Sequence, residues 1–146
     1  MLDHSELCRL IPHTGRMCLL DQLLSWDHES LVCLSHSHRR GDNPLRDNGQ
    51  LAGIHAVEYG AQAMAVHGGL MSQERGEPIR PGFLVSLRNV ELWVERLDLI
   101  ESPLTVSARQ LLADSGNLLY RFAVHADGSS IAKGQLAVMV QRERSY

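Results

Sequence analysis

Glu58 is the one carboxylate in residues 53–69, GIHAVEYGAQAMAVHGG, a run of almost entirely small or apolar side chains. His55 lies one helical turn before Glu58, and Gln62 lies one turn after it. With 3.6 residues per turn, these three side chains and Tyr59 fall within an arc of about 100° on a helix. A carboxylate in an apolar environment either pairs with a cation or a hydrogen-bond donor, or takes up a proton. Both outcomes suit general acid–base catalysis, so Glu58 is the first candidate catalytic residue.

A structural role for Glu58 is the alternative. The chain has 14 lysine and arginine residues, and an arginine could hold this carboxylate without any reaction taking place. The presence of His55 and Gln62 on the same predicted helix face favours a site over a structural ion pair.

The imidazole that would work with Glu58 has two candidates. His38 lies at the end of a predicted strand beside a loop, and His55 lies at the start of the predicted helix. Either could instead be structural, His38 as a surface residue and His55 as a polar residue bonded to a loop carbonyl. His67 is expected to lie near the negative end of the helix dipole. The eight histidines include no HxxxH or HExxH spacing, so no metal site is predicted.

These candidates need a long helix between strands. Ala, Met, Glu and Gln favour a helix from residue 53 to about residue 73, and Pro78 and Pro81 prevent its continuation. Residues 17–27 and 30–38 are typical of strands, and residues 39–50 are rich in turn-forming types. A short helical turn is expected at residues 5–10, with Ser5 as its cap.

After the helix the hydrophobic period changes from that of a helix to that of a strand. Four runs alternate apolar and polar residues, with turns expected at Asp114-Ser-Gly and Asp127-Gly; they are residues 83–95, 103–114, 117–128 and 130–141. Two strands, one helix and four strands predict an α+β fold with the helix packed on an antiparallel sheet. Because the helix is apolar on nearly all sides, a curling sheet or a second subunit must cover it.

Length and composition limit the other possibilities. A chain of 146 residues suits one domain, residues 1–146. A net charge of −3 gives no electrostatic reason to expect nucleic acid as a partner. No run of 18 apolar residues is present, so membrane insertion is not expected. Three cysteines, without CxxC spacing or a signal peptide, predict unpaired thiols in the reducing cytoplasm.

Several motifs resemble one enzyme family. The pattern GxxxxExxAQ, formed by Gly53, Glu58, Ala61 and Gln62, resembles the central helix of the hotdog-fold beta-hydroxyacyl-ACP dehydratases. IPHTGRMCLLDQLLSWD, residues 11–27, is similar to their opening strand, where a structural hydrogen bond is expected from His13. The combination SHRRGDNPLR…VEYGAQAMAVHGGL is similar to the branch associated with aryl polyene biosynthesis. The resemblance covers about residues 9–141.

The resemblance implies a fold, a reaction and a partner. A hotdog fold wraps an antiparallel sheet around the central helix, and two protomers pair into a dimer or a higher homo-oligomer. The substrate is a 3-hydroxyacyl chain on the phosphopantetheine arm of acyl carrier protein, and the product is the trans-2-enoyl thioester. The family needs no cofactor.

The resemblance also implies roles for individual residues. Glu58 matches the acidic catalytic position and Gln62 the glutamine one turn later, while His38 or His55 supplies the imidazole. Backbone amides around Gly53 and Ile54 would polarise the thioester carbonyl. The residues expected to bind the carrier phosphate are arginines after the helix, Arg80 or Arg88.

Two alternative functions share the fold. A hotdog thioesterase would use Glu58 to activate water and release a free acid. A non-catalytic dimer would bind acyl-ACP without turnover, and the absence of the His-Phe-Pro-Gly motif of the fatty-acid dehydratases favours it.

Overall fold

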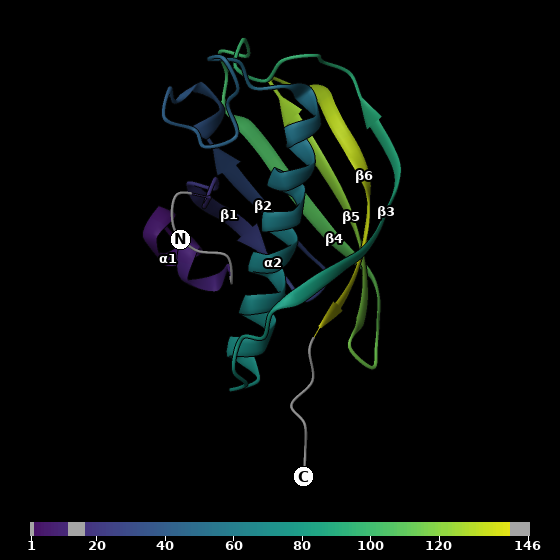
Figure 1. Cartoon of the computed structure of the whole chain (residues 1–146). Coiled ribbons are helices and arrows are strands. Elements are labelled where there is room, and N and C mark those ends of the chain that lie inside the picture. Colours follow the sequence, from purple (N-terminus) through teal and green to yellow (C-terminus); the bar gives the residue numbers. More distant parts are fainter. Residues whose placement is uncertain (1, 12–16, 141–146) are drawn as a thin grey trace.

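An antiparallel sheet of six strands curls around one long helix in the computed structural model of the chain (Figure 1). The structure describes residues 2–11 and 17–140. In chain order its elements are α1 (His4–Leu10), β1 (Gln22–Trp26), β2 (Ser30–Ser35), η1 (Ser37–Arg39), η2 (Gly53–His55), α2 (Ala56–Glu74), β3 (Gly82–Leu92), β4 (Leu104–Asp114), β5 (Asn117–Ala126) and β6 (Ser129–Val140). The strand order β1-β2-β4-β5-β6-β3 puts β1 and β3 at the two edges.

The predicted order of strands and helix is confirmed, with local corrections. The strand predicted at residues 17–27 begins only at Gln22, and the one predicted at residues 30–38 ends at Ser35, before the 3₁₀ turn η1. The long helix opens with a tight 3₁₀ turn, η2, before α2 begins at Ala56. The cap of α1 is Asp3 rather than Ser5: the Asp3 carboxylate accepts from the Glu6 amide at 3.0 Å, and the Glu6 carboxylate accepts from the Asp3 amide. This reciprocal capping box satisfies two amides that a helix start leaves unpaired.

Both predicted hairpin turns are present and set the register of the sheet. Ser115 and Gly116 join β4 to β5, and Asp127 and Gly128 join β5 to β6. All four residues have positive φ angles between 49° and 86°. Two successive residues of positive φ match the right-handed twist of paired strands, which is why Gly follows Ser or Asp at both positions.

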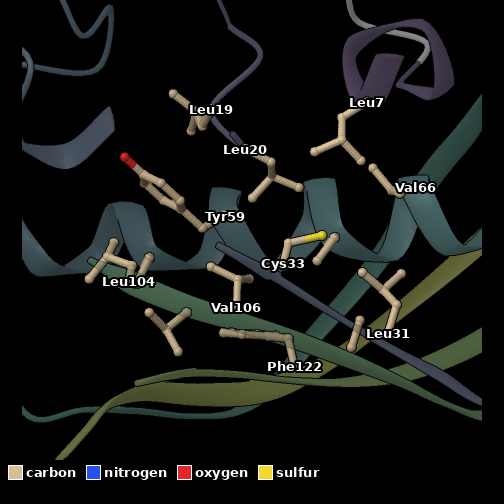
Figure 2. Packing of buried hydrophobic residues seen from close by; sticks show 14 of the residues in the cluster. Leu7, Leu19, Leu20, Leu31, Cys33, Tyr59, Val66, Leu104, Val106 and Phe122 are labelled. Carbon is tan, nitrogen blue, oxygen red and sulfur yellow. The ribbon is translucent and has the colours of Figure 1, made fainter. Parts of the chain in front are cut away.

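The core lies between α2 and the concave face of the sheet (Figure 2). Tyr59 and Val66 of α2 belong to one cluster with Val106 and Phe122 of the central strands, and Leu7 brings α1 into it. All five side chains are fully buried. The predicted helix packed on a curling sheet, the hotdog architecture, is therefore confirmed.

The cysteine prediction was wrong for two of the three thiols. Cys8 of α1 and Cys18 form a disulfide with a Cα–Cα distance of 5.7 Å, while Cys33 is free and buried in β2. Burial raises the pKa of the Cys33 thiol to about 12. The prediction failed because ten residues separate Cys8 from Cys18 and nothing in that spacing indicates contact. Pro12 and His13, which lie between them, are outside the described residues.

Among the residues that the structure describes, no helix combines the length and apolar character needed to cross a bilayer.

Substitution of Gly60 tests the close packing of α2 on the sheet. A Cβ atom at Gly60 would lie 2.7 Å from Phe122 Cβ, whereas one at Gly68 of the same helix would meet nothing within 4 Å. We expect Gly60→Ala to lower the free energy of unfolding by about 1–3 kcal/mol through overpacking. Gly68→Ala should raise it by about 0.5–1 kcal/mol, because alanine restricts the unfolded chain and favours helix. Urea denaturation of both variants measures this, and equal effects would contradict the packing.

Candidate functional site

A cavity of about 650 Å³ lies along one side of α2, a size typical of ligand pockets. Glu58 in the first turn of α2 and Arg75 after its last turn both line it, so it extends roughly 25 Å at 1.5 Å per residue. Its opposite wall comes from β3, β6 and the β4–β5 hairpin. The apolar residues that line it are Ile11, Ala61, Met64, Ala65, Met71, Pro78, Ile79, Leu84, Ala113, Leu118, Val138 and Val140.

Glu58 is half-buried at this cavity, and its partner is an amide donor rather than an arginine. Gln62 Nε2 donates to Glu58 Oε1 at 3.0 Å and also to the Met17 carbonyl. Gln62 Oε1 accepts from the Leu19 amide at 2.8 Å. Because a backbone N–H only donates and a carbonyl only accepts, these contacts fix which way the Gln62 amide points. The Glu58 side chain is therefore held at the cavity by a buried, fully bonded glutamine.

His38 is fully buried and does not line the cavity with Glu58. Its Nε2 donates to the Ile100 carbonyl at 3.0 Å, and its Nδ1 is buried without a hydrogen-bond partner among the described residues. Burial lowers the pKa of the His38 imidazole, because the charged form loses its hydration. His38 thus joins two loops of the fold, and the structure does not bring it together with Glu58.

His55 is half-buried in η2, one helical turn before Glu58. This spacing places the two side chains on neighbouring positions of one helix face. His55 itself is not among the residues that line the cavity with Glu58, so its pairing with Glu58 stays a prediction.

The Gly53 amide has a structural partner. It donates to the Glu95 carbonyl at 2.8 Å, and a Cβ atom at Gly53 would collide with the Val94 carbonyl oxygen. Glycine is needed at this position because the start of the helix touches the backbone after β3. The Gly53 amide is already hydrogen-bonded and is therefore not available to a thioester. Ile54 is exposed beside Gly53, and both line a shallow hollow with Trp93.

The two predicted phosphate-binding arginines lie in different places. Arg80 lines the cavity together with Arg75 and Glu77, which follow the C-terminal end of α2, whereas Glu58 lies near its N-terminal end. Arg88 is exposed on β3 and does not line the cavity. Of the predicted site residues, the structure therefore brings Glu58, Gln62 and Arg80 together around one cavity.

Two polar residues of the cavity, Gln110 and Tyr120, were missed by sequence reasoning. The Tyr120 hydroxyl donates to His67 Nδ1 at 2.6 Å and accepts from Gln110 Nε2 at 3.2 Å. This assignment follows because His67 Nε2 donates to the Asp27 carbonyl. His67 was expected at the helix end, but α2 continues to Glu74. His67 is fully buried, and burial lowers the pKa of its imidazole. The only sequence signal for Tyr120 was the alternation of side chains along β5, which points Tyr120 toward the inner face of the sheet.

Tyr59, the fourth residue of the predicted polar arc, anchors a loop instead. Its hydroxyl contacts Ser37 Oγ at 2.8 Å and accepts from Asn43 Nδ2 at 3.2 Å. Asn43 also donates to the Ser37 carbonyl and accepts from the Leu45 amide. The long loop after β2 is therefore pinned to α2 by buried hydrogen bonds.

Comparison with known proteins relates this architecture to one family. A model described as ApeP-like, ApeP dehydratase, matches residues 5–145. Among solved structures, the dehydratase heterocomplex ApeI:P from Xenorhabdus doucetiae matches with a TM-score of 0.83 and 25% sequence identity, covering 94% of this chain and 91% of that chain. A search of curated proteins found no match.

Thioesterases of low identity share the fold. A hypothetical thioesterase from Streptococcus pneumoniae TIGR4, solved with coenzyme A, has a TM-score of 0.61 and 12% identity, covering 85% of this chain and 88% of that chain. Zebra fish thioesterase superfamily member 2 has a TM-score of 0.64 and 18% identity, covering 97% of this chain and 100% of that chain. At these identities the likeness concerns the fold alone.

The family match extends over nearly the whole chain, and the structural match covers 94% of it. The predicted hotdog dehydratase family and the predicted acyl-ACP dehydration in aryl polyene biosynthesis are therefore confirmed. The chain belongs to the ApeP dehydratase family.

Proposed function

We propose that Glu58 is the acid–base residue with which the chain dehydrates a 3-hydroxyacyl thioester on acyl carrier protein to the trans-2-enoyl thioester. The observation that carries this assignment is the position of the Glu58 carboxylate, which Gln62 holds against the wall of the cavity. A side chain fixed by a second, fully bonded residue is preorganised for proton transfer.

The reaction takes a proton from C2 and the hydroxyl group from C3, so a double bond forms and one water leaves. In our assignment Glu58, in its acid form, gives its proton to the departing hydroxyl, and the imidazole of His55 takes the C2 proton. Passing that proton from His55 to Glu58 restores both groups. His55 is preferred to His38 because His55 is one turn from Glu58, whereas His38 is buried and bonded to a backbone carbonyl.

The apolar wall of the cavity suits an acyl chain. With the thioester beside Glu58, the chain lies along Ala61, Met64 and Ala65 of α2. In this orientation Arg80 contacts the distal end of the acyl group rather than the carrier phosphate. Because the Gly53 amide is bonded to the Glu95 carbonyl, it is not assigned to the thioester carbonyl, and a role for the Ile54 amide remains a prediction. A role for Arg88 in binding the carrier phosphate remains a prediction.

The edge strand β3 supports association with a second hotdog protomer. β3 lies at one edge of the sheet, where its outer backbone groups face away from β6 (Figure 1). Phe83, Leu84 and Val85 are each more than half exposed on it. A long, apolar edge strand is a template for pairing with another strand. We assign this edge to a dimer contact, with a second copy of this chain as the partner; the related ApeI:P assembly is a heterocomplex.

Replacement of the Glu58 carboxylate by an amide tests its role. Glu58→Gln should lower kcat about 10²–10⁴-fold, because the isosteric amide cannot transfer the proton. The measurement is formation of the 2-enoyl product from 3-hydroxyacyl-ACP. Glu74→Gln, at the exposed end of the same helix, is the matched control and should leave kcat unchanged.

The products of the same assay separate the alternatives. A thioesterase releases free carrier thiol without enoyl product, and a non-catalytic binder forms neither. Full activity of Glu58→Gln would remove Glu58 from the chemistry.

Gln62→Leu tests the positioning of Glu58. The change leaves the Leu19 amide and the Met17 carbonyl without their partner, so the free energy of unfolding should fall by about 1–3 kcal/mol. We expect kcat to fall while KM changes little, because the substrate still binds but the carboxylate is no longer held. Gln73→Leu, exposed near the end of the same helix, is the control. An unchanged kcat in Gln62→Leu would show that Glu58 needs no such support.

A charge on the edge strand tests the dimer. Val85→Lys should convert the wild-type dimer to a monomer in sedimentation velocity, because it puts an ammonium group on the contact surface. Leu99→Lys is the matched control, since Leu99 is 63% exposed and Val85 is 62% exposed, but Leu99 lies outside β3. A wild-type chain that sediments as a monomer would contradict association with a second copy.

A further inference from the structure

Three side chains with metal-binding atoms meet where α1 packs beside the start of the sheet. His4 and Cys8 are one turn apart on α1, and Cys18 reaches the same point from the segment before β1. One ligand atom from each of the three lies within 4.8 Å of the others. These residues lie outside the cavity along α2, and the reaction assigned to Glu58 does not use them.

The hydrogen bonds of His4 leave one ring nitrogen for a metal. His4 Nδ1 is 2.7 Å from the Leu20 carbonyl, which can only accept, so Nδ1 carries the proton of the neutral ring. The Asp21 carboxylate lies 3.6 Å from the same nitrogen. His4 Nε2 is then the unprotonated nitrogen, and it faces Cys8 Sγ at 3.5 Å. Histidines that bind metals use this arrangement, with one nitrogen bonded to a carbonyl or carboxylate and the other on the ion.

The spacing of the ligand atoms fits a tetrahedral ion. Zn²⁺ binds sulfur at about 2.3 Å and imidazole nitrogen at about 2.0–2.1 Å, which places neighbouring ligand atoms roughly 3.5–3.8 Å apart. The observed separation between His4 Nε2 and Cys8 Sγ is 3.5 Å. Cys18 is bonded to Cys8 in this structure, so its sulfur must turn away from Cys8 once the disulfide is reduced.

The backbone around these ligands is held in place. The capping box of Asp3 and Glu6 fixes the start of α1, and Leu7 anchors it in the core. The Leu19 amide, next to Cys18, donates to Gln62, and the Leu19 carbonyl accepts from Ser35 Oγ. His4 and Cys8 are only half-buried, so an ion can reach the cluster from solvent.

We propose that, when the Cys8–Cys18 disulfide is reduced, His4, Cys8 and Cys18 form a site for a thiolate-binding divalent metal ion such as Zn²⁺. Three protein ligands leave the fourth tetrahedral position for water or another donor. Two thiolates and one imidazole favour Zn²⁺ over Mg²⁺ or Ca²⁺, which prefer oxygen ligands. The HxxxH and HExxH patterns sought in the sequence could not reveal this set, because its third ligand comes from a separate segment.

Reduction followed by metal binding converts the Cys8–Cys18 disulfide into the proposed site. A phosphine reductant with one water cleaves the S–S bond, giving two thiols and a phosphine oxide. Binding of Zn²⁺ then displaces one proton from each thiol, so two protons are released per ion. The oxidised chain has no thiolate to offer at this position.

Cobalt titration tests the proposal on the full chain. The protein is reduced with a phosphine, exchanged into reductant-free buffer under argon, and titrated with Co²⁺. We expect one Co²⁺ per chain, with thiolate-to-cobalt charge-transfer absorption and the visible bands of four-coordinate cobalt. Zn²⁺ should then displace the cobalt, because it binds nitrogen and sulfur ligands more tightly. The oxidised chain, which needs no substitution, should show none of these bands.

Variants identify the ligands. Cys8→Ser should abolish the charge-transfer band of the one-to-one complex, and His4→Ala should weaken Co²⁺ binding at least about tenfold. Cys33→Ala and His28→Ala are matched controls, because they remove a thiol and an imidazole elsewhere, and both should bind as the wild type does. The proposal is overturned if the reduced wild type has titratable thiols but no cobalt bands. It is equally overturned if Cys8→Ser and His4→Ala, folded by circular dichroism, bind Co²⁺ as tightly as the wild type.

Discussion

The buried amide of Gln62 is the contact on which the arrangement of the site depends. It lies on an apolar helix, where an amide without hydrogen-bond partners would be costly. Its oxygen accepts from the Leu19 amide, and its nitrogen donates to the Met17 carbonyl and to Glu58. One side chain thus ties the segment before β1 to α2 and orients the carboxylate at the cavity. Both the fold and the site require the same glutamine.

The division of α2 into two faces makes room for that site. On one face, Gly60 lets the helix approach the Phe122 ring, and the closely packed core forms there. On the other face, small and flexible side chains such as Ala61, Ala65 and Met64 do not fill the space up to β3, and the cavity remains. Small residues therefore act in opposite ways on the two faces: they bring the backbone close to the sheet, and they leave volume for an acyl chain.

The histidines show why residue type and spacing are insufficient to assign roles. His38, at the end of a predicted strand, could be taken for a surface residue or a base, yet it lies buried in η1 and its Nε2 donates to the Ile100 carbonyl. His67 is equally buried, and its partner Tyr120 comes from β5. Each of these partners is more than 50 residues away in the chain, so no local pattern could indicate it. His55 differs, because it was paired with Glu58 from a spacing of only three residues, which helical periodicity can address.

The amino-acid sequence by itself determined the order of the elements, the two hairpin turns and the proximity of Glu58 to Gln62. Periodicity and turn chemistry could determine these features because they act over a few residues. The family pattern in residues 53–62 also came from that local spacing. Only the tertiary structure decided the donor that holds Glu58, the far wall of the cavity, the burial of His38 and the meeting of His4, Cys8 and Cys18. Those features depend on segments that are distant in the chain, and they become neighbours only when the sheet closes around α2.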